Sequence, residues 1–424
     1  MSDLKEFETL EFASHSNILT TREWFVCRFY FYFHLKPKQA PGFRLKITHF
    51  KLLLHGVRSV GRIIGIEKNR PMLVTNSSEN VFSAGILRNR ILDGIIEEPL
   101  GFFVEKITSL NNQSNPNAFS FIFFQLLEKI CCPFWKLTSL EERNLVEIAR
   151  LTDAYCKLNN VEIFNPVICY KRFSFYVKAW CFLLWIVRPS KVLITDYYNS
   201  SGLGLIHAAK KIKLPVVEIQ HGVISSGHPA YFFPSVELNR ITPDELWHFL
   251  PIPLKSGFQF YINQKNMKKI EHPARKIFQG KSKKLIALEE AARAQFKKIV
   301  LVTLQDASIH EFFSKILELS KASSEYCFLL LPRLVQPNTK SLQMNTKVVS
   351  SFSFYELIQI SDVHITHYST CAIEAPEYGV RSIIWDIDGM GHQLLGDFLN
   401  ADIEGLEYTR IMPSLQGQRG APAG

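Results

Sequence analysis

The strongest candidate site in the sequence is a segment late in the chain, where hydroxyl and acidic residues follow a short apolar run. Val363–Thr366 has the length of a buried strand, and His367 leads from it to Ser369 and Thr370, which begin a predicted helix. The free N–H groups and positive dipole end of a helix start favour an anion, and two hydroxyls add donors. Glu374 lies four residues after Thr370, on the same helix face. This pattern predicts phosphate at Ser369 and Thr370, beside His367, with a ribose hydroxyl on Glu374. The ordinary alternative is a helix cap and a solvated acid.

Two other strand ends are expected to lie alongside this segment. Gln305 follows the apolar run of residues 299–304, and Arg333 closely follows the run of residues 326–331. Because the carboxyl ends of parallel strands meet at one edge, these side chains should converge on one crevice. The planar guanidinium of Arg333 suits a diphosphate, since it binds two phosphate oxygens at once.

A second candidate site is the triplet Gln-His-Gly at the end of an earlier predicted strand. Val216–Ile219 is that strand, and His221 and Gly222 follow it at the edge where open α/β sheets bind ligands. His221 is the first candidate for a base, and Asp196 and His228 are the substitutes. The alternative for each is a satisfied structural residue.

The elements that must position these groups form two α/β series. Strands that alternate with helices at this spacing predict parallel sheets with helices on both faces. The first series is a strand at 191–195, a helix at 203–213 and a strand at 216–219. The second has strands at 299–304, 326–331, 363–366 and 382–385, with helices at 309–319, 354–360 and 370–378.

Length and composition support this organisation. The chain has 424 residues, of which 47% are hydrophobic, 21% charged and 12% aromatic, and this balance excludes disordered and collagenous classes. We predict an N-terminal α/β domain at 1–250, a basic linker at 251–298, a C-terminal α/β domain at 299–415 and a flexible tail at 416–424. Ser139–Leu158 is predicted as a helix that begins with a capping box at Ser139 and Glu142.

The net charge of +10 is concentrated near the start of the chain. Aromatic residues beside lysine and arginine suit a membrane interface. They also suit a single nucleic-acid strand or a solvated basic face over an aromatic core. No helix-turn-helix, zinc-finger or RNP signature is present, so nucleic acid is not expected as a partner. The apolar window at 173–187 is too short to span a bilayer, which predicts peripheral attachment to an anionic membrane. The basic residues are Arg22, Arg28, Lys36, Lys38, Arg44, Lys46, Lys51, Arg58 and Arg62.

Metal and disulfide chemistry are not expected. The eight cysteines include no C-x-x-C pair, and the first residues do not form a secretory signal, so we predict reduced thiols in the cytosol. His364 and His367 flank a strand end, but no acid or cysteine lies at a matching metal-ligand spacing. Asp386 and Asp388 are interpreted as loop residues. We therefore predict no metal and no cofactor.

Two segments resemble a known family. Residues 361–385 (SDVHITHYSTCAIEAPEYGVRSIIW) resemble the donor-binding segment of GT-B-type bacterial glycosyltransferases for capsule and lipopolysaccharide biosynthesis, of the sialyltransferase-like and Kdo-transferase-like kind. Residues 215–231 (PVVEIQHGVISSGHPAY) are similar to the Gln-His-Gly segment of the first domain in such enzymes. The resemblance implies two Rossmann-like domains facing a cleft, with the acceptor on the side of the N-terminal domain at 1–250 and a nucleotide-sugar held by the C-terminal domain at 299–415. It also implies that Ser369 and Thr370 hold the donor phosphate.

The chain departs from that family at two places. Leu331-Pro332-Arg333 stands where relatives carry His-Pro, and Ser382 stands where many retaining relatives carry a second glutamate, which favours inversion. Pro376 is expected to bend or end the donor helix.

The resulting hypothesis is an inverting glycosyltransferase. It moves a sugar from a nucleotide-activated donor to a surface polysaccharide or lipid-linked glycan, in the cytoplasm and peripherally at the inner membrane. Inversion needs a base for the acceptor hydroxyl, which is the role expected of His221. The alternatives are a CDP-alditol phosphotransferase of the same fold and a non-catalytic, membrane-associated assembly partner.

Overall fold

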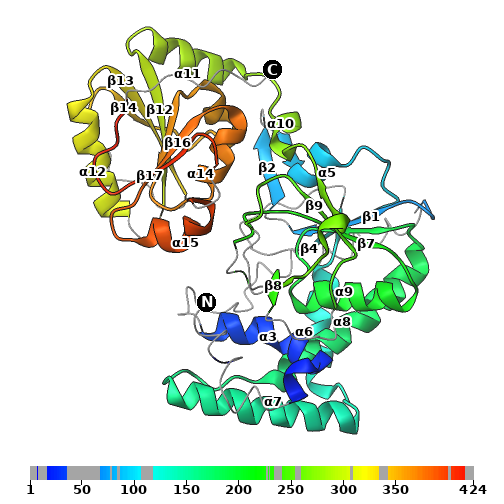
Figure 1. The fold of residues 1–424 in the computed structure, drawn as a ribbon. Helices are drawn as coiled ribbons and strands as arrows, with labels where there is room; N and C mark the ends of the chain where they lie inside the picture. Colours follow the sequence, from blue (N-terminus) through cyan, green and yellow to red (C-terminus); the bar gives the residue numbers. More distant parts are fainter. Residues whose placement is uncertain are drawn as a thin grey trace.

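The computed structural model describes residues 7, 17–35, 67–76, 79–83, 86–106, 118–225, 228, 230–233, 241–253, 259–305, 309–333, 342–399 and 403–415. Figure 1 shows two α/β bodies, one formed by the earlier part of the chain and one by the later part. Within the described ranges, no helix combines the length and the hydropathy that a membrane span requires.

The first domain is built on a seven-stranded sheet in which all neighbouring strands run parallel. Its central strands are short apolar runs buried on both faces, as expected of a parallel sheet covered by helices. In sheet order the strands are β11 (Met267–Lys269), β9 (Glu245–His248), β7 (Val216–Ile219), β6 (Val192–Ile194), β1 (Met72–Asn76), β4 (Phe102–Lys106) and β5 (Phe119–Ser120). A hairpin of β2 (Asn80–Ser83) and β3 (Ile86–Asn89) follows β1.

Successive residues of each strand supply opposite faces of this sheet. Val74 of β1 packs in a large core with α8 (Pro166–Val187) and α9 (Ser200–Lys211), whereas Leu73 packs on the other side with α5 (Arg90–Ile95). The larger core also includes α3 (Arg22–Leu35), α6 (Ile122–Cys131) and α7 (Ser139–Leu158), which lie at the end of the domain drawn at the bottom of Figure 1.

The second domain repeats this plan with a six-stranded parallel sheet. Phe312, Ile316 and Leu319 follow helical spacing on α12 (Ile309–Ala322) and pack against one face, while Leu285 of α11 (Lys283–Arg293) packs against the other. The strands, in sheet order, are β14 (Thr346–Val348), β13 (Tyr326–Pro332), β12 (Lys298–Leu304), β15 (Val363–Thr366), β16 (Arg381–Trp385) and β17 (Leu406–Thr409). The predicted fold class, an α/β chain with two Rossmann-like domains, is confirmed.

The stretch predicted as a linker, residues 251–298, contributes to both domains. β11 is an edge strand of the first sheet, and α11 belongs to the second core. Between them, α10 (Pro273–Ile277) packs so closely on α5 that a Cβ on Gly94 would lie 2.5 Å from the Pro273 carbonyl oxygen. Gly94 therefore permits the contact between the connecting segment and the first domain.

Two helices differ in detail from the sequence prediction. The capping box of α7 is formed by Thr138 and Glu141, one residue earlier than predicted, because the Thr138 hydroxyl accepts from the Glu141 N–H. The apolar window at 173–187 is the last two thirds of α8, which begins at Pro166 and is capped by Asn165.

The basic aromatic segment near the start is largely core where the structure describes it. On α3, Trp24, Phe25, Phe29 and Phe31 are buried in the first core, and even Arg28 is only 3% exposed. The aromatic part of the expected membrane interface is therefore wrong for α3. Together with Val26 and Cys27, which are also buried, these rings occupy every side of the helix, which is typical of a helix enclosed by others. The basic residues from Lys36 to Arg62 lie outside the described residues.

Candidate functional site

A cavity of about 550 Å³ lies at the carboxyl edge of the second sheet. Gln305, Arg333, Ser369 and Thr370, which the sequence singles out, all line it. The Arg333 guanidinium donates to the Gln305 side-chain oxygen over 3.4 Å, so the ends of β12 and β13 are joined at the cavity. Its volume is in the range of about 300–1,000 Å³ that is usual for small-molecule sites.

The turn after β15 presents the two hydroxyl residues. The Ser369 hydroxyl accepts from the Cys371 N–H over 3.3 Å, and the Ser369 N–H donates to the Thr366 hydroxyl over 3.3 Å. The expected helix at 370–378 is wrong as a single element: α14 (Cys371–Glu374) gives way to the 3-10 helix η9 (Ala375–Tyr378), which contains Pro376. Because α14 has only four residues, the groups available to an anion at this turn are the hydroxyls and the Arg333 guanidinium.

Glu374 does not line this cavity. It is buried, accepts from the Tyr355 hydroxyl over 2.8 Å, and lies 3.3 Å from His272 Nε2. Burial alone would raise the pKa of Glu374, but His272, Arg90 and Tyr355 together hold that pKa below its ordinary value. The carboxylate is therefore engaged in a contact with the connecting segment, and the structure does not bring it to the expected ribose position.

His367 also lies outside the cavity lining. Its ring is fully buried, stacks on Phe312 with centroids 5.5 Å apart, and its Nδ1 lies 3.1 Å from the Trp385 carbonyl oxygen. On the other side of the ring, Nε2 lies 3.0 Å from an Asp388 carboxylate oxygen. His367 thus packs in the core next to the ends of β15 and β16 and does not face the cavity.

His367, Asp386 and Asp388 place one potential ligand atom each within 4.8 Å of one another. The Asp386 carboxylate already accepts from the N–H groups of Gly389 and His392, at 2.8 and 2.9 Å. It also accepts from the Tyr408 hydroxyl, and Asp388 accepts from the Met390 N–H, both over 2.9 Å. These bonds cap the start of α15 (Met390–Leu399), where the positive end of the dipole disfavours a cation. That no metal takes part stays a prediction.

His221 lies at the carboxyl edge of the first sheet, two residues after β7. Its Nε2 is 3.2 Å from the Tyr198 hydroxyl, and its Nδ1 is buried without a hydrogen bond from any described residue. If Nε2–H donates to Tyr198, Nδ1 keeps a free lone pair that can accept a proton. His228 lies nearby, with its ring 4.9 Å from that of Tyr198. Two of the three expected catalytic residues therefore contact the same tyrosine.

Asp196, the third expected catalytic residue, lies just after β6 and is hydrogen-bonded to residues at the ends of the neighbouring strands. One carboxylate oxygen accepts from the side-chain amides of Asn76 and Asn199, over 3.1 and 2.8 Å. Lys106 at the end of β4 donates to the Asp196 carbonyl oxygen over 3.2 Å. Although burial favours the neutral acid, Lys106 and His221 hold the pKa of Asp196 below its ordinary value. Asp196 is thus ionised beside His221.

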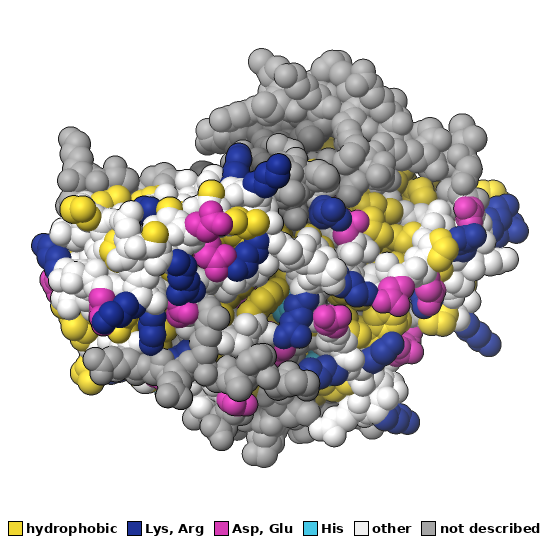
Figure 2. Space-filling view, turned by 90° about the horizontal axis from the view of Figure 1, so that it is seen from above, with side chains coloured by type: hydrophobic (Ala, Val, Ile, Leu, Met, Phe, Trp, Pro, Cys, Tyr) yellow, Lys and Arg dark blue, Asp and Glu magenta, His cyan; other side chains and the backbone are white. Residues whose placement is uncertain are grey.

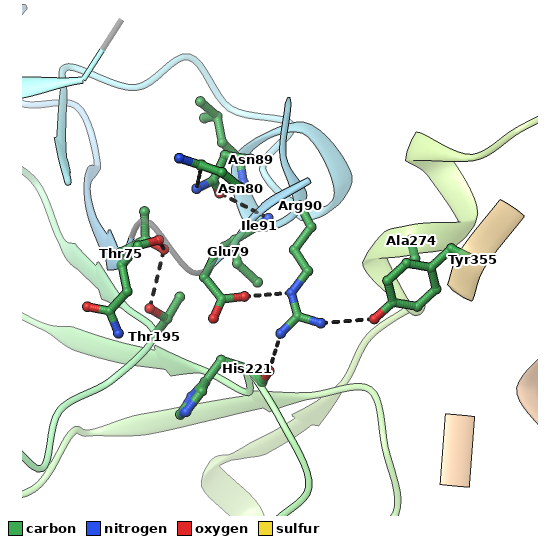
Figure 3. A network of polar contacts seen from close by, with 12 residues as sticks. Thr75, Glu79, Asn80, Asn89, Arg90, Ile91, Thr195, His221, Ala274 and Tyr355 are labelled. Carbon is green, nitrogen blue, oxygen red and sulfur yellow. Dashed lines mark hydrogen bonds and ion pairs between the residues drawn. The ribbon is translucent and has the colours of Figure 1, made fainter. Parts of the chain in front are cut away.

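Arg90, at the start of α5, is the centre of a polar network next to His221 (Figure 3). Its Nε lies 2.5 Å from the buried Glu79 carboxylate, and a terminal nitrogen donates to the His221 carbonyl oxygen. The other terminal nitrogen donates to the Tyr355 hydroxyl of the second domain over 3.1 Å. Burial favours the neutral form, but Glu79, Tyr355 and Glu374 hold the pKa of Arg90 above its ordinary value.

This network joins the two candidate sites. Tyr355 accepts from Arg90 and donates to Glu374, while its neighbours Ser353 and Phe354 line the cavity. Arg90 is itself positioned by Asn89, whose side chain caps α5 by accepting from two backbone N–H groups over 3.1 Å. The backbone beside His221 is thus bonded, through Arg90 and Tyr355, to the segment that forms the cavity wall.

Three functional candidates, Lys106, Glu79 and Arg90, lie in a part of the sequence that carries no motif. The sequence offered one signal for Lys106, namely that the apolar runs at 72–76 and 102–106 end in the polar residues Asn76 and Lys106. A polar residue at the carboxyl end of a buried parallel strand lies at the edge of the sheet where ligands bind.

Glu218, on β7, is fully buried three residues before His221 and gives a testable pH dependence. It accepts from the hydroxyls of Tyr231 and Tyr261 over 2.8 and 2.5 Å, and burial raises its pKa to about 8. Between its unfolded pKa of about 4.3 and the folded value, the native state binds a proton that the unfolded chain lacks. Stability should therefore fall as pH rises through this window.

In Glu218→Gln this part of the pH dependence should disappear, so that the variant gains stability relative to the native chain as the solution becomes alkaline. Urea unfolding between about pH 5 and about pH 9 measures the effect. Replacing the exposed Glu404 by glutamine provides the control and should leave the profile unchanged. Parallel profiles for the native chain and Glu218→Gln would show that this carboxyl is ionised at neutral pH.

Comparison with known proteins gives structural neighbours only. No family model and no curated protein matches the sequence. Among solved structures, the chain is similar to the glycotransferase of kitacinnamycin, at 12% identity and a TM-score of 0.45 over 81% of this chain and 86% of that one. It is also similar to UDP-GlcNAc 2-epimerase from Methanocaldococcus jannaschii, at 12% identity and a TM-score of 0.47 over 80% and 88%. A third neighbour is CalG4, the calicheamicin glycosyltransferase, at 14% identity and a TM-score of 0.43 over 79% and 84%.

Proposed function

We propose that this protein is a glycosyltransferase whose nucleotide-sugar donor binds in the cavity of the second domain. The observation that carries the proposal is the convergence of Gln305, Arg333, Ser369 and Thr370 on that one cavity. A guanidinium that binds oxygens in pairs and two hydroxyl donors suit a diphosphate.

The acceptor side of the proposed reaction is the edge of the first sheet. There the acceptor hydroxyl oxygen attacks the anomeric carbon and the bond from that carbon to the phosphate oxygen breaks. The hydroxyl proton passes to His221 Nδ1, and Arg333 with the hydroxyls of Ser369 and Thr370 stabilises the departing nucleoside phosphate. One displacement of this kind inverts the configuration of the sugar.

The proposed acceptor is a surface polysaccharide or lipid-linked glycan in a bacterium, reached from the cytoplasmic side of the inner membrane. The net charge of +10 supports work beside an acidic partner such as that membrane.

The test of the donor site is a thermal-shift panel of CMP, CDP, UDP, GDP and dTDP. A ligand at about 100 times its Kd stabilises the folded state by about 2.7 kcal/mol, which moves a melting midpoint by degrees. We expect one nucleotide to raise the Tm of the native chain and to have little effect on Ser369→Ala/Thr370→Ala.

The control variant is Ser314→Ala, whose hydroxyl bonds only within α12 and lies outside the cavity lining. It should respond to the nucleotide like the native chain. If no nucleotide shifts the native chain, or the double variant responds equally, this cavity is not the donor site.

A further inference from the structure

The outer side of α8 carries an exposed group of aromatic and basic side chains that the proposed reaction does not use. Lys171, Lys178, Phe182 and Trp185 follow the spacing of one helix face, and Phe182 and Trp185 are 54% and 67% exposed. The opposite face, with Trp180 among its residues, is buried in the first core. The exposed rings are therefore not needed to hold the helix in place.

A second element extends the same side of the domain. The 3-10 helix η4 (Cys132–Phe134) is held against α8, because Lys171 donates to the Pro133 carbonyl oxygen over 3.2 Å and the Lys178 ammonium lies 4.4 Å from the centre of the Trp135 ring. Phe134 on this element is 83% exposed, and Ile130 just before it is 66% exposed. We call Ile130, Phe134, Lys171, Lys178, Phe182 and Trp185 the α8 surface.

The charge on this surface has one sign. The 22 residues of α8 include no aspartate or glutamate, and its third cation, Arg172, is paired with Glu128 at 2.9 Å. By contrast, the face of the molecule in Figure 2 carries acidic and basic side chains interspersed. A single exposed apolar residue needs no explanation, but exposed rings set among unopposed lysines indicate a partner.

We propose that the α8 surface docks on an anionic lipid bilayer. Phenylalanine and tryptophan rings at headgroup depth, with lysine ammoniums beside lipid phosphates, are the chemistry of an interfacial helix. A second copy of the chain fits less well, since a symmetric contact would bring Lys171 and Lys178 against the same lysines. This inference does not depend on glycosyl transfer.

The experiment is flotation of the full chain with vesicles of phosphatidylcholine alone or mixed with phosphatidylglycerol. We expect the native chain to float with the mixed vesicles, and Phe182→Ser/Trp185→Ser to lose on the order of tenfold or more in partitioning. Lys178→Gln should lose on the order of fivefold, and less at high salt. The control Met344→Ser/Ile411→Ser removes two apolar side chains of the second domain that are even more exposed than Phe182 and Trp185, and it should float like the native chain.

Three results would overturn the proposal. The native chain could remain unbound to both kinds of vesicle, or the Phe182→Ser/Trp185→Ser variant, checked for an unchanged Tm, could float as well as the native chain. The third is a dimer in sedimentation equilibrium that this variant dissociates, which would identify a second copy as the occupant. None of these results bears on nucleotide binding, so failure here is distinguishable from failure of the proposed reaction.

Discussion

Arg90→Ala is expected to lower the free energy of unfolding by about 3–5 kcal/mol, because it leaves the buried Glu79 carboxylate without its cation. Glu79 is only 3% exposed, and its carboxylate lies 2.5 Å from Arg90. The substitution also removes donors from the His221 carbonyl and the Tyr355 hydroxyl. Urea unfolding of the native chain and the variant, followed by tryptophan fluorescence, measures the loss.

Two comparison variants separate the effect of the unpaired Glu79 charge from the effect of the lost hydrogen bond between Arg90 and Tyr355, which links the two domains. Tyr355→Phe removes the two hydrogen bonds of the Tyr355 hydroxyl, to Arg90 and to Glu374. Each lost bond should lower the free energy of unfolding by only about 0.5–1.5 kcal/mol. Arg90→Met combined with Glu79→Gln removes both charges and should be more stable than Arg90→Ala alone. A loss below about 1 kcal/mol in Arg90→Ala would mean that water reaches Glu79 and replaces the cation.

The second domain was the more predictable from sequence, for a physical reason. Its two longest strands, β12 and β13, are almost wholly apolar runs, and α12 carries the regular spacing of Phe312, Ile316 and Leu319, so these elements show their own period. The cavity residues could then be placed, since Gln305 and Arg333 directly follow β12 and β13, and Ser369 and Thr370 lie in the turn after β15.

The network around Arg90 could not be predicted in the same way. Glu79 and Arg90 flank a small hairpin, and Tyr355 lies 265 residues after Arg90, so no local spacing relates them. Glu374 shows the same limit. Helix periodicity predicted it beside Thr370, but α14 ends at Glu374, before Pro376, and the Glu374 carboxylate points to His272 on the connecting segment. Contacts between domains depend on how two sheets are docked, which residue pattern alone does not encode.

The basic aromatic segment shows how a composition signal can be ambiguous. Trp24 and Phe31 on α3 are buried, whereas Phe182 and Trp185 on α8 are exposed, although both helices mix rings with cations. The number of neighbouring helices does not distinguish them, since α8 packs against α3, α6, α7 and α9. The difference is that one face of α8, the one with Phe182 and Trp185, is left uncovered, which residue types alone do not reveal.

His221→Ala is expected to reduce the rate of sugar transfer by about 10²–10⁴-fold, the range typical for loss of a general base. The nucleotide-induced rise in Tm should be retained, because His221 does not line the donor cavity. Product formation measured by mass, with the Tm shift measured on the same protein, checks both parts. A product increment that contains phosphorus would instead identify alditol-phosphate transfer.

The control for His221→Ala is His392→Ala, which removes an exposed imidazole ring of the second domain and should leave the rate unchanged. Tyr198→Phe removes the hydroxyl 3.2 Å from Nε2 and should reduce the rate by a smaller factor, since it loosens the ring without removing the base. Added imidazole should restore part of the rate of His221→Ala but none of the loss in Tyr198→Phe. If His221→Ala turned over at the native rate, the proton would have to pass to His228 or Asp196, both of which the structure places at the same edge of the first sheet.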